Sequence, residues 1–547
     1  MLSRLVWGTQ ASLLAGVVPV AVASVLGTLL GVVAGLGARA VENAVMRVLD
    51  VLFAFPSVLL AIAIAASLGA GLVSMMAALA VILVPAVARV VVTEVARLRE
   101  LDFMQAARAG GAGWPFIARW HVLPNIMPAV SVYCSALVGL CVVLGAGLSF
   151  LGLEWRRPTP NGGHGGRPAP VRVHRAAARP APGRGDLPRL GFVQRARRGT
   201  APALRREVEV HHVSPLLEIE DLTVAFTAGE RTAHAVRGVT LSADTGRTTV
   251  VLGESGSGKS VTARAVLGLL GRNARVGGDV RLGGESLLGL DERAMSARRG
   301  RDIGLVPQDP GGSLDPLRRV GGQIAEVLRA HRVRNSRAAR RELALELLSQ
   351  AGVPEPGRVA RSYPHELSGG LRQRVAIAAA VACGPRLLIA DEPTTALDMT
   401  VQAQILALFQ RLQRELGMAL LLVTHDVGVA RLMASTVVVM YAGRVVEEGP
   451  AARVLDRPAH PYTAALLAAQ PRPGIPRGEL AGLPGLPPSA TAEIEGRCAL
   501  VPRCPYAVAA CSAEPPLLAP VAAGGSAACP VPWPDPVAAP GAGARTR

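Results

Sequence analysis

The octapeptide GESGSGKS at residues 253–260 constrains the fold most. It matches the phosphate-binding pattern G-x-x-x-x-G-K-[ST], with a β-rich run at 248–252 before it and an apolar helical pattern at 260–270 after it. Lys259 is the only lysine among 58 lysine and arginine residues. A compact ammonium suits a tight phosphate-binding loop better than a planar guanidinium does. The sequence therefore predicts an α/β P-loop domain.

The loop has the chemistry that a bound phosphate needs. Its glycines let backbone N–H groups wrap an anion at the start of a helix, and a serine hydroxyl after the lysine can reach Mg²⁺. We therefore expect the nucleotide to be held by Gly253, Ser255, Gly256, Ser257, Gly258, Lys259, Ser260 and Val261.

The first third of the chain has the composition of a membrane protein. Across the whole chain 50% of residues are hydrophobic, only 18% are charged, and the mean hydropathy is +0.35. Long runs that are apolar on all sides and almost free of charge indicate helices that cross a bilayer core of about 30 Å. We place four such spans at 12–36, 49–69, 72–92 and 127–151.

A basic loop sets the orientation of these spans. Segment 93–126 carries Arg97, Arg99, Arg108 and Arg119, and the positive-inside rule places such a loop in the cytoplasm. The 37–48 loop falls on the same side. We expect a multi-pass protein of the cytoplasmic membrane with its nucleotide-binding domain on the cytoplasmic face.

Two stretches of the 93–126 loop, QAARAGG at 105–111 and HVLPN at 121–125, resemble the cytoplasmic loop of bacterial ABC-importer permeases. The flanking text RVLDVLFAFPSVLLAIAIA at 47–65 and LSFLGLEWRRPTP at 148–160 is similar to the dipeptide/oligopeptide/nickel branch. The resemblance implies a short coupling helix seated in a groove of an ATPase, with small residues that permit close packing. Gln105 replaces the glutamate that is usual in the family. Permeases of this branch have six spans, so the resemblance leads us to expect that counterparts of the first and the last are missing here.

Four further motifs follow the P-loop in a fixed order, and together they resemble an ABC ATPase. They are VPQDP at 306–310, HELSGGLRQR at 365–374, LLIADEPTTALD at 387–398, which includes a D-loop at 396–398, and LLLVTHD at 420–426. The usual glutamine after the signature glycines is Leu371 here. The resemblance implies ATP hydrolysis by attack of water on the γ-phosphate.

The same resemblance assigns roles to individual residues. Glu392, His425 and Gln308 are expected to be catalytic, and Mg²⁺ is expected at Ser260, Gln308 and Asp391. A carboxylate at the end of a buried strand suits Mg²⁺. Phe226 is a candidate for stacking on adenine, although a strand aromatic is more often a core residue. Further ATP contacts are expected from Ser368, Gly369, Gly370 and Asp398.

Near the C-terminus, HPYTAALLAAQPRP at 460–473 again resembles the peptide-importer ATPases. Four cysteines follow, and their cytoplasmic setting argues against disulfides. Their spacing leaves zinc, an iron–sulfur cluster and unliganded thiols open, because it lacks the C-x₂-C pairs of structural zinc. The resemblance favours a [4Fe–4S] cluster at Cys498, Cys504, Cys511 and Cys529.

Segment 157–214 is rich in Arg, Pro, Gly and Ala and supplies much of the net charge of +18. Three interpretations remain open: an arm for nucleic acid or acidic lipid, a flexible disordered linker, and a frame-shifted translation of the last permease span. Translation of the other two reading frames tests the third, which fails if neither frame gives an apolar run of ~20 residues.

We thus expect an all-α transmembrane permease domain at 1–156, the 157–214 segment, an α/β P-loop ABC ATPase domain at 215–458 with a helical subdomain near 310–385, and a Cys-containing extension at 459–547. The expected function is ATP-driven import of peptides, nickel or another small solute. Expected partners are a second ABC ATPase domain, a second permease subunit and an extracytoplasmic substrate-binding protein. One alternative is an active ATPase with a non-functional permease remnant. Another, an ABC ATPase that acts on nucleic acid, is disfavoured by the spans.

Overall fold

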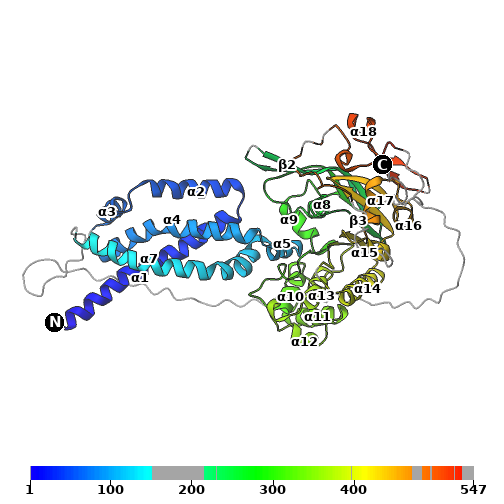
Figure 1. Cartoon of the computed structure of the whole chain (residues 1–547). Coiled ribbons are helices and arrows are strands. Elements are labelled where there is room, and N and C mark those ends of the chain that lie inside the picture. The colour runs from blue at the N-terminus through cyan, green and yellow to red at the C-terminus, as the bar shows by residue number, and fades with distance from the viewer. Residues whose placement is uncertain are drawn as a thin grey trace, which may run out of the picture.

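The computed structural model describes residues 2–69, 71–150, 215–229, 231–395, 397–470, 483–492, 494, 496–522 and 524–531. A helical region and an α/β region lie side by side, and the helix α5 reaches from the first to the second (Figure 1). The predicted linker at 157–214 and Ala396 of the predicted D-loop lie outside the described residues.

The helical region follows the apolar runs of the sequence. Among the residues that the structure describes, three helical stretches are long and apolar enough to cross a membrane, Leu13–Leu36, Leu72–Arg99 and Trp114–Leu148. Its elements are α1 (Leu2–Leu36), α2 (Arg39–Ala54), α3 (Ser57–Leu68), α4 (Leu72–Arg99), α5 (Asp102–Ala109), α6 (Trp114–Ile117), η1 (Ala118–Val122) and α7 (Leu123–Leu148).

The predicted span at 49–69 is not one straight helix. Helices α2 and α3 are bent by 91° at a short break, and the count of spans reaches four only if this bent pair is one span. Phe55 has an extended backbone, with φ −87° and ψ 135°, because Pro56 follows it and disfavours the helical conformation of the preceding residue. The proline that causes this break was visible in the sequence, inside the apolar run predicted as one span.

A glycine stripe brings α1 and α4 together. Gly27, Gly31 and Gly35 are spaced four residues apart and therefore lie on one face of α1. A Cβ atom on Gly31 would lie 2.6 Å from the Cβ of Val91 on α4. The two backbones approach closely because these positions have no side chain, which is a common way for membrane helices to pack.

The α/β region contains two sheets. The first is antiparallel, in the order β2-β1-β4-β5. The second has the order β11-β12-β10-β9-β3-β8-β7-β6, and β6, β7, β8, β3 and β9 run parallel. The strands are β1 (Leu217–Ala228), β2 (Arg231–Ala243), β3 (Thr248–Leu252), β4 (Ala274–Leu282), β5 (Glu285–Ser286), β6 (Ile303–Val306), β7 (Leu387–Asp391), β8 (Ala419–Thr424), β9 (Thr436–Tyr441), β10 (Arg444–Pro450), β11 (Ala519–Pro520) and β12 (Ser526–Ala527).

The helices of this region cover the parallel sheet and fill the interval between β6 and β7. That interval, where the sequence predicted a helical insert, holds α10, α11, α12, η3 and α13. The elements are α8 (Lys259–Val266), α9 (Glu292–Arg298), α10 (Val320–Ala330), α11 (Arg337–Gln350), α12 (Pro356–Val359), η3 (Pro364–Glu366), α13 (Gly369–Ala380), α14 (Met399–Leu416), α15 (Val427–Met433), α16 (Ala451–Asp456), α17 (Pro461–Ala468), η4 (Val501–Arg503) and α18 (Ala510–Ala513).

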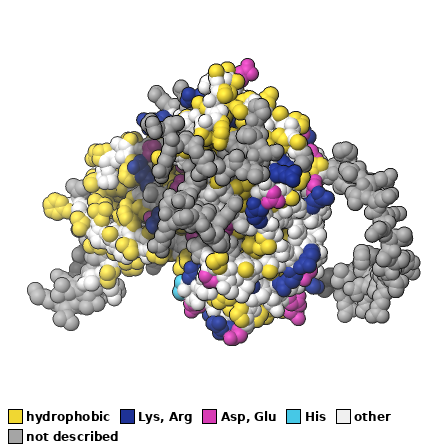
Figure 2. All heavy atoms as spheres, turned by 45° about the vertical axis from the view of Figure 1, so that its right-hand side comes forward, with side chains coloured by type: hydrophobic (Ala, Val, Ile, Leu, Met, Phe, Trp, Pro, Cys, Tyr) yellow, Lys and Arg dark blue, Asp and Glu magenta, His cyan; other side chains and the backbone are white. Residues whose placement is uncertain are grey.

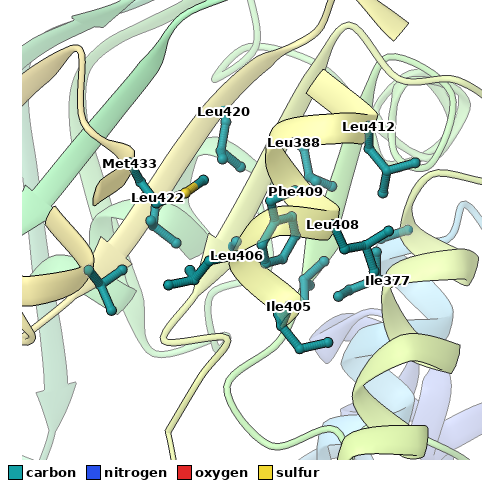
Figure 3. Close-up of a cluster of buried hydrophobic side chains, with 14 of the residues drawn as sticks. Ile377, Leu388, Ile405, Leu406, Leu408, Phe409, Leu412, Leu420, Leu422 and Met433 are labelled. Carbon is teal, nitrogen blue, oxygen red and sulfur yellow. The ribbon is translucent and has the colours of Figure 1, made fainter. Parts of the chain in front are cut away.

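The main core lies between the parallel sheet and its helices. In Figure 3, Phe409 of α14 lies among Leu388 of β7, Leu422 of β8 and Ile377 of α13. The buried residues Ile405, Leu408, Phe409 and Leu412 recur at helical spacing, so one face of α14 is apolar. This packing fixes β7 and β8, whose carboxyl ends carry predicted site residues.

The surface reflects the same division. In Figure 2 hydrophobic side chains crowd the left of the view, and most visible charged side chains lie to the right and below. Exposed large apolar residues are frequent on α1 to α4, including Leu13, Val25, Leu59 and Val73. Such a surface suits lipid better than water.

Candidate functional site

The loop at 253–258 joins β3 to α8, as the P-loop pattern predicts. Gly258 has φ +99° and caps α8 in the left-handed conformation. A Cβ on it would lie 2.5 Å from the Ala235 carbonyl oxygen, and one on Gly253 would lie 2.3 Å from the Met440 carbonyl oxygen. Only glycine fits at these two positions, so the loop can present its N–H groups.

Lys259 is buried beneath this loop, only 4% exposed. Its Nζ donates to the carbonyl oxygens of Gly253 and Glu254, both at 2.8 Å, and lies 3.4 Å from Ser257 Oγ. Burial lowers the pKa of the Lys259 ammonium, and the nearby carboxylates of Glu392, Asp391 and Glu254 oppose that shift. Ser255 and Gly256 are exposed at the tip of the loop, and Val261 packs against the neighbouring core.

The end of β7 brings a carboxylate to the start of α8. Ser260 Oγ donates to Asp391 Oδ1 over 2.7 Å, and Asp391 is 3% exposed. Burial raises the pKa of the Asp391 carboxyl, and the hydrogen bond from Ser260 opposes this. A hydroxyl and a carboxylate oxygen at this distance form the oxygen-rich donor set that Mg²⁺ prefers.

Glu392 is the centre of the three predicted catalytic residues. Its Oε2 lies 3.2 Å from Gln308 Nε2, 3.3 Å from His425 Nδ1 and 3.1 Å from Thr395 Oγ1. Its backbone is left-handed, with φ +46°, and its N–H donates to the Val423 carbonyl. Gln308, Glu392 and His425 therefore meet at one point, and Thr395 is a contact that the sequence did not identify.

The predicted signature residues lie apart from the loop. Ser368, Gly369 and Gly370 form the exposed or half-exposed start of α13. Within the residues that the structure describes, no hydrogen bond joins them to loop 253–260. A Cβ on Gly370 would lie 2.9 Å from Val401 Cγ1 of α14.

Two other predicted ATP contacts have structural roles here. Asp398 caps α14, because its carboxylate accepts the N–H of Val401 at 2.9 Å. Phe226 lies in β1, opposite Ala233 and Ala274, and packs against the core beneath that sheet. Their contacts with ATP stay predictions.

Helix α5 and the turn after it contact the α/β region. Phe103, Ala106 and Ala107 line a pocket together with Leu305 of β6 and with Pro307, which directly precedes Gln308. The Gly110 carbonyl lies 3.0 Å from His331 Nε2, and the Gly111 carbonyl accepts from Ser296 Oγ at 3.0 Å. Across the described residues, the Gln105 side chain makes no hydrogen bond to the α/β region.

A buried cluster of charged side chains also joins the permease loop to the α/β region. His121 is 3% exposed, with Nδ1 2.6 Å from Asp315 Oδ2 and Nε2 2.8 Å from Glu326 Oε1. Arg318 also bonds Glu326, and its guanidinium lies over the Phe116 ring. Carboxylates only accept when ionised, so a histidine between two of them is satisfied when both its nitrogens carry protons. The sequence showed HVLPN as a motif but gave no sign of its acidic partners, which lie about 200 residues later.

The four C-terminal cysteines come together. Cys498, Cys504, Cys511 and Cys529 line one small pocket, beside His460. Burial raises the pKa of the Cys498, Cys504 and Cys529 thiols. In the described part of the chain no group of three or more His, Cys, Asp or Glu has an arrangement that could hold a metal ion.

Three family profiles match the chain in order. The profile described as binding-protein-dependent transport system inner membrane component matches residues 27–164, ABC transporter matches 236–395, and oligopeptide/dipeptide transporter, C-terminal region, matches 446–511. A Brucella abortus (strain 2308) protein named for peptide import ATP-binding is 49% identical over 322 residues, which are 56% of this chain and 94% of that protein. This chain belongs to the oligopeptide/dipeptide group of ABC transporters.

A further relative and one solved structure are similar to the ATPase part of this ABC transporter. The oligopeptide transport ATP-binding protein OppD of Salmonella typhimurium (strain LT2) is 45% identical over 302 residues, covering 55% of this chain and 90% of its own. A solved dimeric ATP-binding cassette with ADP and phosphate is 32% identical, with a TM-score of 0.40, over 43% of this chain and 98% of its own. The family profiles show that the chain joins a membrane permease region to a cytoplasmic ABC ATPase whose ATP hydrolysis is coupled to transport.

Proposed function

We propose that this chain drives the import of peptides across the cytoplasmic membrane. The observation that carries the proposal is the position of α5 against the α/β region. Residues of this permease helix line one pocket with Pro307, and the next residue, Gln308, bonds Glu392 beside His425. Movement at the permease loop can therefore reach the site of hydrolysis through adjacent packed residues.

Peptide is the cargo that the relatives' names support. The Brucella and Salmonella proteins are named for peptide import and oligopeptide transport. Nickel or another small solute is the second candidate, because the resemblance on which the sequence prediction rests includes nickel importers. An extracytoplasmic binding protein would deliver the cargo.

The site geometry supports the hydrolytic roles proposed from the resemblance. Loop 253–260 would hold the phosphates of ATP, and Ser260 and Asp391 would hold Mg²⁺, with Gln308 as a further contact to the metal. Glu392 would orient the attacking water, and His425 would contact the transferred phosphate. Rate enhancement would come mainly from positioning and from charge stabilisation.

A complete site needs a second ATPase. Ser368 and Gly369 are exposed, and among the described residues neither bonds loop 253–260 of the same chain. In head-to-tail pairing, the signature of one ATPase would complete the P-loop site of the other. A second copy of this chain or a related subunit would supply that partner, and a second permease would complete the pathway.

We also propose that the four C-terminal cysteines hold a [4Fe–4S] cluster. Their shared pocket supports this, since four cysteine thiolates are the usual ligands of such a cluster. Anaerobically purified protein is expected to contain about four iron and four sulfide per chain. Stoichiometric zinc without sulfide would contradict the cluster.

The test of import uses cells that take up a labelled oligopeptide. Deletion of the gene is expected to lower uptake, and the wild-type chain to restore it. Glu392→Gln is expected to restore no uptake and to lower ATP turnover of the purified chain by about 100-fold or more, because it removes the water-orienting carboxylate. ATP binding is expected to persist.

The control is Glu355→Gln, an exposed acidic residue outside the motifs, whose carboxylate pairs with the exposed Arg358. If the wild-type chain hydrolyses ATP but restores no uptake of peptide or nickel, the import proposal fails. That outcome would favour an ATPase attached to a permease remnant.

A further inference from the structure

An arginine of the C-terminal extension reaches into the nucleotide loop. Arg503 ends η4, and its side chain is 7% exposed. Its Nη1 lies 3.1 Å from Oε2 of Glu254, and its Nη2 lies 3.4 Å from Oε1. The guanidinium therefore faces the carboxylate with two nitrogens, the arrangement in which arginine binds carboxylates most specifically. Glu254 is the second residue of GESGSGKS.

Other groups hold both members of this pair. Arg503 Nε donates to the Pro484 carbonyl at 3.0 Å, and Nη1 lies 3.3 Å from the Tyr441 hydroxyl. The Glu254 N–H donates to the hydroxyl of Tyr462 at 2.8 Å. Pro484 and Tyr462, like Arg503, lie beyond residue 459, so the extension holds the loop through both backbone and side chain.

The position and the charge of Glu254 both matter for phosphate binding. Its carbonyl oxygen accepts from Lys259 Nζ at 2.8 Å, so a displaced Glu254 also displaces the ammonium. Its carboxylate puts a negative charge in a loop that must attract a polyphosphate. Arg503 offsets that charge within hydrogen-bond distance, where the interaction is strongest.

We propose that Arg503 is a positioning residue of the nucleotide site, neutralising and orienting Glu254 so that the C-terminal extension sets the affinity of the loop for Mg-ATP. The inference rests on the proposed nucleotide site at 253–260. It gives the extension a function that is separate from anything its cysteines bind.

The test measures the Kd of a fluorescent ATP analogue with Mg²⁺ for the full-length chain in lipid nanodiscs. Arg503→Gln is expected to weaken binding roughly tenfold, since it leaves a half-buried carboxylate unpaired. Arg503→Lys is expected to fall between, because it keeps the charge and loses the two-nitrogen contact. Glu254→Gln added to Arg503→Gln is expected to restore most of the affinity.

Arg457→Gln is the control, an exposed arginine two positions before the extension begins. Wild-type affinity in Arg503→Gln would overturn the proposal. The proposal would also be overturned if Arg503→Gln lowers both the affinity and the melting temperature and the added Glu254→Gln does not restore the affinity. That result would show that Arg503 has a purely structural role. Lys259→Ala must weaken binding strongly; if it binds normally, the nucleotide site itself is misplaced and the proposed function fails instead.

Discussion

Some site residues of this chain can be recognised from the sequence immediately around them, and others cannot. Lys259 stood out as a solitary lysine in a glycine loop, and Asp391 and Glu392 followed a buried apolar strand, so the sequence sufficed to select them. Thr395 had no such signal, although it contacts Glu392. His121 and Arg503 find their acidic partners about 200 and 249 positions away, and only folding brings these residues together.

A pH dependence follows from one buried histidine. Burial lowers the pKa of His460 to about 4, and its Nδ1 accepts the N–H of Tyr462. Below its ordinary pKa near 6.5 the unfolded chain binds a proton that the folded chain does not bind until about pH 4. Stability is therefore expected to fall between pH 6.5 and pH 4, by up to ~3 kcal/mol from this residue.

The measurement is the melting temperature of the ATPase transition against pH, in wild type and in His460→Gln. The fall on acidification is expected to be smaller in the variant. His234→Gln, at an exposed histidine, is the control and is expected to follow the wild type. Parallel pH profiles for wild type and His460→Gln would refute the assignment.

Among the elements, length and apolar pattern predicted the long helices well and the breaks less well. Run 49–69 satisfied the span criterion, yet Pro56 divides it into α2 and α3 with a 91° bend. Local backbone restriction outweighed hydrophobic length there. The coupling helix was expected from resemblance, and α5 does lie against the ATPase, although the contact uses small residues and main-chain carbonyls rather than Gln105.

The turn after α5 supplies an element-level prediction. Gly111 has φ +81°, and a Cβ there would lie 2.3 Å from His331 Nε2. Gly111→Ala is expected to unseat α5 and lower peptide uptake about tenfold or more, since strain of about 1–3 kcal/mol acts at the docking contact. Mg-ATP binding is expected to be unchanged.

Gly113→Ala is the matched control in the same turn, because its Cβ would meet nothing closer than 3.8 Å. Uptake and nucleotide binding are measured for both variants in parallel. Equal uptake in the two variants would show that the turn tolerates a side chain and that the seat of α5 does not depend on Gly111.

For the whole molecule, the order of motifs predicted a permease region followed by an ABC ATPase. It did not predict that the C-terminal extension joins the ATPase sheet, where β12 pairs antiparallel with β10, Glu447 opposite Ala527. Strands of two residues carry too little periodicity to be recognised in a sequence. The domain limits at 156, 214 and 458 stay predictions.

The His121 cluster has a consequence for how the two halves stay together. With both histidine nitrogens protonated, His121 and Arg318 carry two positive charges, and Asp315 and Glu326 carry two negative ones. The four groups are thus neutral together and largely buried, with the Arg318 side chain 19% exposed, and mobile ions screen such buried pairs far less than surface pairs. Raising the ionic strength is therefore not expected to weaken the contact between the permease region and the ATPase. Faster hydrogen exchange at the cluster in high salt would contradict this.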